Sequence, residues 1–294
     1  MIEPPTDPRT LHHEDGFPEQ EQEQPGLIGH TVPTPDHGED SYRGSGRLTD
    51  HRALITGGDS GIGRAVAIAF AREGADVAIA HLPEEQTDAD ATVELVTAAG
   101  RRGVSLPGDI RDEGFASALV DATVSAFGGL DILVLNAAYQ KDRNGLQNLE
   151  TGEMDRVFRT NLYAMMFTAR AAIPHLNPGA SIIVTSSIQA FNPSPGLIDY
   201  AMTKAGQVAF VKALAEDLGP RGVRVNAVAP GPIWTPLIPA TGWDAERLAT
   251  FGQDTPLGRA GQPAELAGAY VYLASDDASF VSGAVLPVTG GKGL

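Results

Sequence analysis

Tyr200 and Lys204 stand four residues apart in a stretch with the pattern of a helix. On a helix, this spacing places the phenol and the ammonium on one face. Ser187 lies thirteen residues before Tyr200, at the end of the apolar run 181–186. A run of this kind reads as a buried strand. A hydroxyl, a phenol and an ammonium can therefore converge where a strand end meets a helix.

Carbonyl reduction needs such a set of groups. Hydride arriving at a carbonyl carbon leaves negative charge on the oxygen, which must then receive a proton. A free phenol has a pKa of about 10, and a neighbouring ammonium lowers that pKa by favouring the phenolate. Among the six tyrosines, Tyr139 has Arg143 at the same spacing, but its segment reads as a loop. The competing interpretation of Tyr200 and Lys204 is a surface aromatic ring stacked on a lysine stem.

Composition narrows the class of protein. Of the 294 residues, 42% are hydrophobic, which is enough for a sizeable core, and none is cysteine. The lack of cysteine excludes disulfides and thiolate metal sites. No apolar run approaches the roughly 18 residues of a membrane span, and no secretory signal is visible, so we expect a cytoplasmic protein. The net charge of −16 argues against nucleic acid or an anionic membrane as the partner.

Residues 1–46 differ from the rest of the chain. They contain ten acidic side chains, two arginines and seven of the 21 prolines. Few apolar residues accompany them, so this segment cannot fold alone. We interpret it as an arm that is either disordered or wrapped on the oligomer. Four histidines lie in it, but their spacing matches no compact metal site, and we expect no bound metal.

From residue 50 onward, apolar strand-like runs alternate with helix-like runs. We expect strands at 52–56, 76–80, 103–106, 131–135, 180–185, 223–228 and 285–288. We expect helices at 61–73, 87–99, 112–127, 153–173, 199–218 and 263–274. Such alternation predicts a parallel sheet covered by helices on both faces. Residues 47–294 are therefore predicted to form one α/β domain, a doubly wound seven-stranded sheet of the Rossmann type.

The first expected strand leads into a glycine-rich turn that opens a helix. Gly57, Gly61 and Gly63 allow a tight turn, a close approach of the backbone to a pyrophosphate, and close packing of the helix on the strand. Amides at the helix N-terminus then face the phosphates. A glycine cluster alone is weak evidence, but its place between a strand and a helix is the context that a dinucleotide site requires.

Thr56-Gly57-x-x-x-Gly61-x-Gly63, Ser187 and Tyr200-x-x-x-Lys204 together resemble the short-chain dehydrogenase/reductase family, over residues 47–294. Matching segments recur in the family's order at 108–110, 136–138, 161 and 230–235. Ala138 stands where the family has glycine, so we expect a small shift of that loop. The segments 42–48, 58–60 and 288–291 resemble the bacterial subgroup of NAD(P)H-dependent aldehyde or ketone reductases, whose members are often labelled glucose or ribitol dehydrogenase homologues.

The resemblance implies roles for four residues. Tyr200 would be the acid in reduction and the base in oxidation, with its pKa lowered by Lys204, which also binds the nicotinamide ribose. Ser187 would donate a hydrogen bond to the substrate oxygen, with Ser186 as its rival. Asn161 would hold a water of a proton relay, the alternative being a helix-interior asparagine bonded to backbone. The expected cofactor contacts are Thr56, Gly57, Asp59, Ser60, Gly61, Ile62, Gly63, His81, Asp109, Ile110, Asn136, Ala137, Ala138, Tyr200, Lys204, Pro230, Gly231, Ile233 and Thr235.

The choice between NAD(H) and NADP(H) depends on the end of the second strand. An acidic residue there would favour NAD by bonding the ribose 2′-hydroxyl and repelling a 2′-phosphate. Residues 80–83 contain no carboxylate, and Arg64 is a nearby cation, so we expect NADP(H) to be favoured. Glu84 and Glu85 leave NAD(H) open, because either could swing in and reverse the preference.

The substrate and the assembly are less defined. Residues 233–258 are rich in aromatic and apolar side chains and are expected to close the substrate pocket, with Tyr139, Gln189 and Asn192 among its lining. Excess apolar surface on the helices near 153–173 and 199–218 predicts a homotetramer, across which the arm could lie. Two other hypotheses remain: a silent NAD(P)-binding protein, and a stress-associated structural protein that works through its tail.

Overall fold

A seven-stranded parallel sheet forms the centre of the molecule in the computed structural model, which describes residues 6–13 and 15–294. The strand order is β3-β2-β1-β4-β5-β6-β7. The strands are β1 (Arg52–Thr56), β2 (Asp76–His81), β3 (Gly103–Pro107), β4 (Leu130–Leu135), β5 (Leu176–Thr185), β6 (Arg224–Pro230) and β7 (Val285–Val288). The Rossmann-type α/β domain predicted from the alternating pattern is thereby confirmed.

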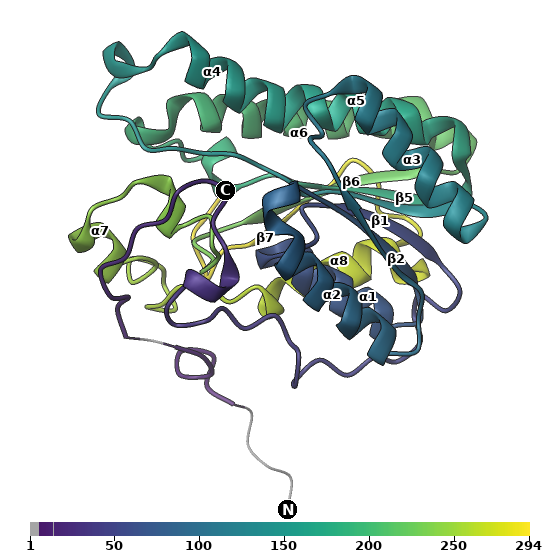
Figure 1. Ribbon diagram of the computed structural model, residues 1–294, viewed down its shortest axis with the longest axis horizontal. Coiled ribbons are helices and arrows are strands. Elements are labelled where there is room, and N and C mark those ends of the chain that lie inside the picture. The colour runs from purple at the N-terminus through teal and green to yellow at the C-terminus, as the bar shows by residue number, and fades with distance from the viewer. Residues whose placement is uncertain (1–5, 14) are drawn as a thin grey trace, which may run out of the picture.

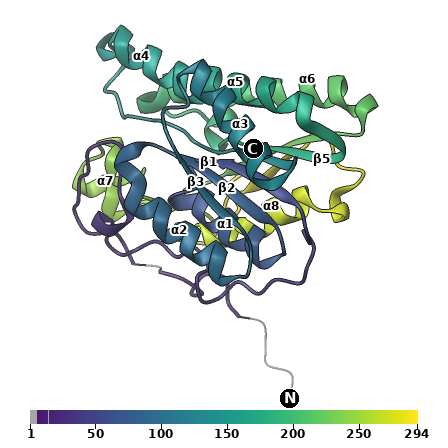
Figure 2. The same ribbon diagram turned by 45° about the vertical axis from the view of Figure 1, so that its right-hand side comes forward.

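Helices cover both faces of this sheet (Figure 1). One layer holds α1 (Gly61–Arg72), α2 (Gln86–Ala98) and α8 (Ala264–Ala274). The opposite layer holds α3 (Glu113–Phe127), α4 (Thr151–Phe158), α5 (Ala164–Ala172) and α6 (Ile198–Leu218), as Figure 2 also shows. Each layer buries its own apolar cluster against the sheet. The strands read as continuous apolar runs because both of their faces are buried.

Two predicted elements differ from the structure. The single helix expected over 153–173 is divided into α4 and α5 by a π-helical turn at Arg159–Tyr163, a distortion that often marks functional sites. Strand β5 begins at Leu176, four residues before the expected start, and its pairing with β4 changes register between Leu130 and Ile132. Pro178 and Gly179 had hidden the extension, because both residues are poor strand formers.

The described part of the N-terminal segment lies on the outside of its own domain. It contains one short 3₁₀ turn, Ile28–His30. In Figure 1 it runs in purple past α7 (Ala245–Ala249), a short helix in the segment 233–258. Below we call residues 6–13 and 15–46 the arm, and residues 233–258 the lid. Across the part of the chain that the structure describes, no helix has the length and apolar character needed to cross a membrane.

Candidate active site

A cavity of about 1130 Å³ opens at the carboxyl ends of the parallel strands. It lies where the strand order reverses, because β1 pairs with β2 on one side and with β4 on the other. In open α/β sheets this switch point is the usual ligand crevice. The cavity is larger than the 300–1,000 Å³ typical of a single small-ligand site, so it has room for a dinucleotide beside a substrate.

The glycine turn between β1 and α1 has the backbone form that a pyrophosphate site needs. Gly57 and Gly61 have positive φ angles of 63° and 50°. A Cβ on Gly63 would lie 1.9 Å from the carbonyl oxygen of Gly57, so no other residue type is accommodated there. Ser60 precedes the first turn of α1, and its side chain makes no capping bond to the helix amides. Those amides are therefore able to bind an anion.

Hydrogen bonds tie the ends of three strands together beneath the cavity. Thr56 Oγ1 accepts from the amides of Asn136 and Ala137, at 3.0 and 3.2 Å. Asn136 Nδ2 donates to the carbonyl oxygen of Gly57, and Thr185 Oγ1 donates to Asn136 Oδ1, both at 3.0 Å. Thr56 itself does not line the cavity. It shapes the cavity floor by fixing the loop after β4.

Ser187 and Tyr200 both line the cavity, and the Ser187 hydroxyl is close enough to the Tyr200 phenol to lower its pKa. Ser187 follows β5 and Tyr200 lies in the first turn of α6, so the strand end and the helix meet as the spacing predicted. Ser187 Oγ also accepts from the amide of Gln189, at 3.1 Å. The rival Ser186 donates instead to the carbonyl oxygen of Lys204, at 3.0 Å, which holds α6 against β5.

Tyr200 and Lys204 are both buried, and burial sets their pKa values. Burial raises the pKa of Tyr200 to about 12, against the smaller lowering effect of the Ser187 hydrogen bond. Burial lowers the pKa of Lys204 to about 7. Lys204 Nζ donates to the carbonyl oxygen of Thr185 at 2.6 Å and lies 5.3 Å from the Tyr200 ring centroid. The Tyr-x-x-x-Lys spacing predicted a lowered pKa for Tyr200, but the pKa is raised. The reason is that desolvation disfavours both the phenolate and the ammonium.

Asn161 lies in the π-helical turn and is buried behind the cavity wall. Its Oδ1 accepts from the amide of Tyr139 at 2.8 Å, and its Nδ2 donates to the carbonyl oxygen of Tyr139 and to Thr203 Oγ1 at 2.9 and 3.1 Å. Gln207 Nε2 donates to the Asn161 carbonyl oxygen at 2.9 Å. The Asn161 side chain thus holds the backbone at Tyr139. This arrangement corresponds to the second interpretation given above, an asparagine within a helix that bonds to backbone.

Most of the predicted cofactor residues meet at this cavity. Those that line it are Gly57, Asp59, Ser60, Gly61, Ile62, His81, Asp109, Ile110, Asn136, Ala137, Ala138, Tyr200, Lys204, Pro230, Gly231, Ile233 and Thr235. Three predicted site residues do not line it, namely Thr56, Gly63 and Asn161. Each of the three acts on a neighbouring segment that does line the cavity.

Acidic side chains stand near the end of β2. Asp59 is buried, and its Oδ2 atom has no hydrogen-bond partner among the described residues. Burial raises the pKa of Asp59 to about 6 and that of Glu85 to about 8, and the charge of Asp59 adds to the shift on Glu85. Glu85 also accepts from the amide of Leu82 at 2.8 Å. Arg64, expected as a nearby cation, instead pairs with Glu39 of the arm at 3.4 Å and does not line the cavity.

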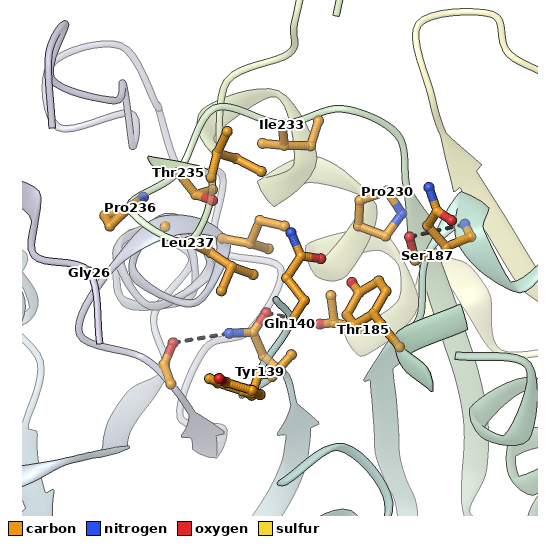
Figure 3. A pocket seen from close by; sticks show the side chains of 18 of the residues that line it. Gly26, Tyr139, Gln140, Thr185, Ser187, Pro230, Ile233, Thr235, Pro236 and Leu237 are labelled. Atoms are coloured by element: carbon orange, nitrogen blue, oxygen red, sulfur yellow. Dashed lines mark hydrogen bonds between the residues drawn. The ribbon is translucent and has the colours of Figure 1, made fainter. Parts of the chain in front are cut away.

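The lid forms the roof of the cavity. Thr235, Pro236 and Leu237 lie across the cavity from Tyr139 and Thr185 in Figure 3. Trp234 is fully buried, and Trp243 and Phe251 pack around the same apolar cluster. The predicted pocket residues Tyr139, Gln189 and Asn192 all line the cavity.

Several lining residues were not expected from the sequence. Gln140 lines the cavity beside Tyr139, and its Nε2 donates to Thr241 Oγ1 at 2.8 Å. The arm contributes three further lining residues, Gln24, Pro25 and Gly26. No sequence motif marks these three, because an arm with few apolar residues gives no signal of where it packs.

The residues present are suited to a nicotinamide dinucleotide. The turn leaves no room for a Cβ at Gly63, the amides of α1 face an anion site, and the hydroxyl and phenol lie further along the same cavity. When bound, the cofactor supplies or accepts hydride. Within the described residues, no three His, Cys, Asp or Glu side chains gather in a way that could hold a metal ion.

The sequence matches the family described as "Enoyl-(Acyl carrier protein) reductase" over residues 57–292. It is 50% identical to an uncharacterized oxidoreductase, YhxD, of Bacillus subtilis, over 97% of each chain. It is 44% identical to a glucose and ribitol dehydrogenase of Daucus carota, over 94% of this chain and 96% of that one. A short-chain dehydrogenase from Burkholderia cenocepacia, solved with NADP, superposes with a TM-score of 0.78 at 35% identity, covering 83% of this chain and 98% of that one.

The doubly wound sheet, the glycine turn and the Ser187–Tyr200–Lys204 set define an NAD(P)-dependent oxidoreductase. The chain belongs to the short-chain dehydrogenase/reductase family, as the resemblance of its motifs predicted.

Proposed function

We propose that the protein transfers hydride between a nicotinamide and the carbon of a small carbonyl compound or alcohol, with Tyr200 as the acid and base. The observation that carries this proposal is that the Ser187 hydroxyl and the Tyr200 phenol are neighbours in the lining of one cavity. A hydroxyl and a phenol placed side by side can bind a single substrate oxygen between them. Proton transfer to that oxygen by a positioned side chain is general acid catalysis.

In the reduction direction, the Tyr200 hydroxyl gives its proton to the substrate oxygen as the carbon gains hydride. Its raised pKa keeps the phenol protonated at neutral pH, which is the state this step uses. Ser187 donates a hydrogen bond to the same oxygen and stabilises the developing negative charge. In the oxidation direction, the phenolate removes the alcohol proton, so a raised phenol pKa makes oxidation the slower direction near neutral pH.

Lys204 and Asn161 act around this pair. With a pKa lowered to about 7, Lys204 exchanges a proton readily at neutral pH, and in our proposal it returns the proton that Tyr200 gives up. It also binds the ribose of the nicotinamide. Asn161 belongs to the proposed catalytic set through the backbone of Tyr139, which it holds at the edge of the cavity.

The lining favours a small polar carbonyl compound, including a sugar or polyol. The cavity lining combines the amide side chains of Gln140, Gln189 and Asn192 with the apolar lid residues Ile233 and Leu237. Amide groups donate and accept hydrogen bonds, as the hydroxyls of a polyol require. The relative named for glucose and ribitol supports this choice of substrate class.

We propose NADP(H) as the favoured cofactor, with NAD(H) as the alternative. The end of β2 at 80–83 contains no carboxylate, and the Burkholderia relative was solved with NADP. Glu85 is nearby, but with its pKa raised to about 8 it is mostly protonated at neutral pH. A neutral carboxyl does not repel a 2′-phosphate and can donate a hydrogen bond to it.

We further propose that residues 47–294 are the catalytic domain, that the protein is cytoplasmic, and that it assembles as a homotetramer. Exposed apolar side chains on one helix layer support the assembly. Met154 of α4, Tyr163 of the π-helical turn, Met166 of α5 and Met202 of α6 are between 39% and 58% exposed. Such patches mark protein interfaces. Light scattering tests the tetramer, and a monomer would contradict it.

A panel of aldehydes, ketones, sugars and polyols, each measured with both cofactors, tests the proposed function. We expect NADPH-dependent reduction of small polar carbonyl compounds. Absence of turnover on the whole panel in both directions would contradict the proposal. A large preference for NADH would contradict only the choice of cofactor.

A further inference from the structure

The arm is anchored to the lid by an aromatic stack. Phe17 of the arm lies parallel to Trp234 of the lid, with ring centroids 3.8 Å apart and planes 10° from parallel. Both side chains are buried, Phe17 at 3% and Trp234 at 0% exposure. Trp234 Nε1 donates to the carbonyl oxygen of Pro33, also in the arm, at 2.7 Å. The arm therefore covers Trp234 on its ring face and accepts the hydrogen bond of its indole nitrogen.

Polar contacts continue from this anchor along the lid. The amide of Gln22 donates to the carbonyl oxygen of Pro239 at 3.3 Å. Gln24 Nε2 donates to the carbonyl oxygens of Ala240 and Gln140, at 3.0 and 3.2 Å. Gln140 lines the substrate side of the cavity, so one arm side chain joins the lid to the opposite wall.

Beyond Gln24, the arm passes toward the cofactor half. A Cβ on Gly26 would lie 2.3 Å from the carbonyl oxygen of Pro236, so the arm backbone touches the lid backbone there, beside Pro236 in Figure 3. Two residues later, the amide of Ile28 donates to Asp88 Oδ2 of α2 at 2.9 Å. Residues 17–28 thus bridge the lid and the helix that follows β2. We call this segment the strap.

We propose that the strap is part of the substrate-binding site, and that Phe17 is a positioning residue for the hydride-transfer reaction because it holds the lid over the cavity. The expected effect on substrate KM rests on the proposed function. The holding of the lid by Phe17 rests only on the Phe17–Trp234 contact. The three cavity-lining residues of the strap, Gln24, Pro25 and Gly26, lie seven to nine residues after Phe17 in the chain.

The proposed role of the strap differs from general stabilisation of the fold, because it concerns the lid alone. Its closest packing is with the lid, which carries the apolar side of the proposed substrate pocket. The pyrophosphate turn at 57–63 is built by β1 and α1, and the lid adds only Ile233 and Thr235 to the expected cofactor contacts. Loosening the strap should therefore weaken binding of the carbonyl substrate more than binding of the cofactor.

The test uses Phe17→Ala, with Phe17→Tyr as the variant that keeps the ring and Leu11→Ala as the matched control. Leu11 is an arm residue whose side chain is 52% exposed. The chain has two tryptophans, so in a Trp243→Phe background the emission comes from Trp234 alone. Acrylamide quenching of that emission is measured in this background. Thermal melting, calorimetric binding of NADP⁺ and the KM of the best carbonyl substrate are measured for each variant with Trp243 intact, because Trp243 lines the cavity. Phe17→Leu replaces Phe17→Ala if the alanine variant does not fold.

For Phe17→Ala we expect stronger quenching of Trp234, a KM for the carbonyl substrate raised about tenfold, and an NADP⁺ affinity changed by less than about twofold. Phe17→Tyr should restore both readouts, and Leu11→Ala should match wild type. Wild-type quenching in Phe17→Ala would overturn the inference, and so would an unchanged KM or a parallel loss of NADP⁺ affinity. If the wild-type enzyme turns over no carbonyl substrate, the proposed function fails, and quenching alone then decides whether the strap holds the lid.

Discussion

Lys204 Nζ donates a hydrogen bond of 2.6 Å to the carbonyl oxygen of Thr185, the last residue of β5. The lysine is buried, and its side chain spans from α6 to the sheet beneath Tyr200. This bond fixes the ammonium at the end of the strand that leads to Ser187. Lys204 is thus held by the sheet itself, and no carboxylate among the described residues forms an ion pair with it.

Replacement of Lys204 by methionine should separate catalysis from stability. We expect kcat to fall about 100-fold or more, because the proton supply to Tyr200 is lost. The melting temperature should stay the same or rise, since burial already disfavours the charged lysine and methionine fills a similar volume. Steady-state kinetics and thermal melting check this. A kcat within a few-fold of wild type would contradict the role given to Lys204.

The adjacent serines provide an internal comparison. Ser187→Ala should lower kcat about 100-fold or more, the usual loss for one donor to a developing oxyanion. Ser186→Ala should cost about 1 kcal/mol of stability, because it removes the hydrogen bond to the Lys204 carbonyl. Its effect on kcat should be much smaller than that of Ser187→Ala. Equal losses of kcat in the two variants would contradict the assignment of Ser187.

Cofactor preference should depend on pH through Glu85. Below pH 8 this carboxyl is mostly protonated, and above pH 8 its negative charge repels a 2′-phosphate. We therefore expect the Kd of NADP⁺ to rise relative to that of NAD⁺ between about pH 7 and pH 9. Glu85→Gln should flatten this dependence, and the exposed neighbour change Glu84→Gln should leave it in place. A flat ratio in the wild-type enzyme would rule out this role for Glu85.

Glu73 joins the arm to the end of α1 and should make stability sensitive to acid. Its fully buried side chain accepts bonds from Tyr42, from the amide and hydroxyl of Ser45, and from Arg47. These partners hold the pKa of Glu73 down at about 2. The stabilisation is therefore complete above about pH 5 and lost as the pH falls toward 2.

The change Glu73→Gln tests whether the ionised carboxylate of Glu73 stabilises the protein. We expect it to destabilise the protein by on the order of 3 kcal/mol, because it removes the buried charge to which Tyr42, Ser45 and Arg47 bond and leaves Arg47 only the longer pair with Asp277, at 4.0 Å. Urea titrations at pH 7 and pH 4 measure the difference. The gap between wild type and variant should be smaller at pH 4, and an equal gap at both values would contradict the proposed linkage.

The sheet and the Ser187–Tyr200 pair were predictable because local sequence determines them. Strands such as Arg52–Thr56 are short apolar runs, and a βα turn with Gly57, Gly61 and Gly63 has few other structural uses. The position of Asn161 in a π-helical turn was not predictable, since the pattern over 153–173 is continuous with an ordinary helix. In that turn the Asn161 side chain bonds to the backbone of Tyr139.

The packing site of the arm and the pKa values of Tyr200 and Lys204 could not be predicted from the sequence, because both depend on tertiary structure. Phe17 is one aromatic residue in a charged, proline-rich segment, and only the fold brings Trp234 to it. In the same way, the sequence places Lys204 one helical turn from Tyr200, which predicts a lowered phenol pKa. The opposite direction follows from burial, and burial depends on how α6 packs against β5.

Turnover by Tyr200→Phe tests the central claim most directly, with Tyr163→Phe as a control that makes the same change at an exposed tyrosine. The phenylalanine keeps the ring and removes only the hydroxyl that gives the proton. We expect kcat for the best carbonyl substrate to fall about 1,000-fold or more, while calorimetric binding of NADP⁺ stays near wild type. Turnover near wild type in Tyr200→Phe would contradict the assignment of Tyr200 as the acid and base.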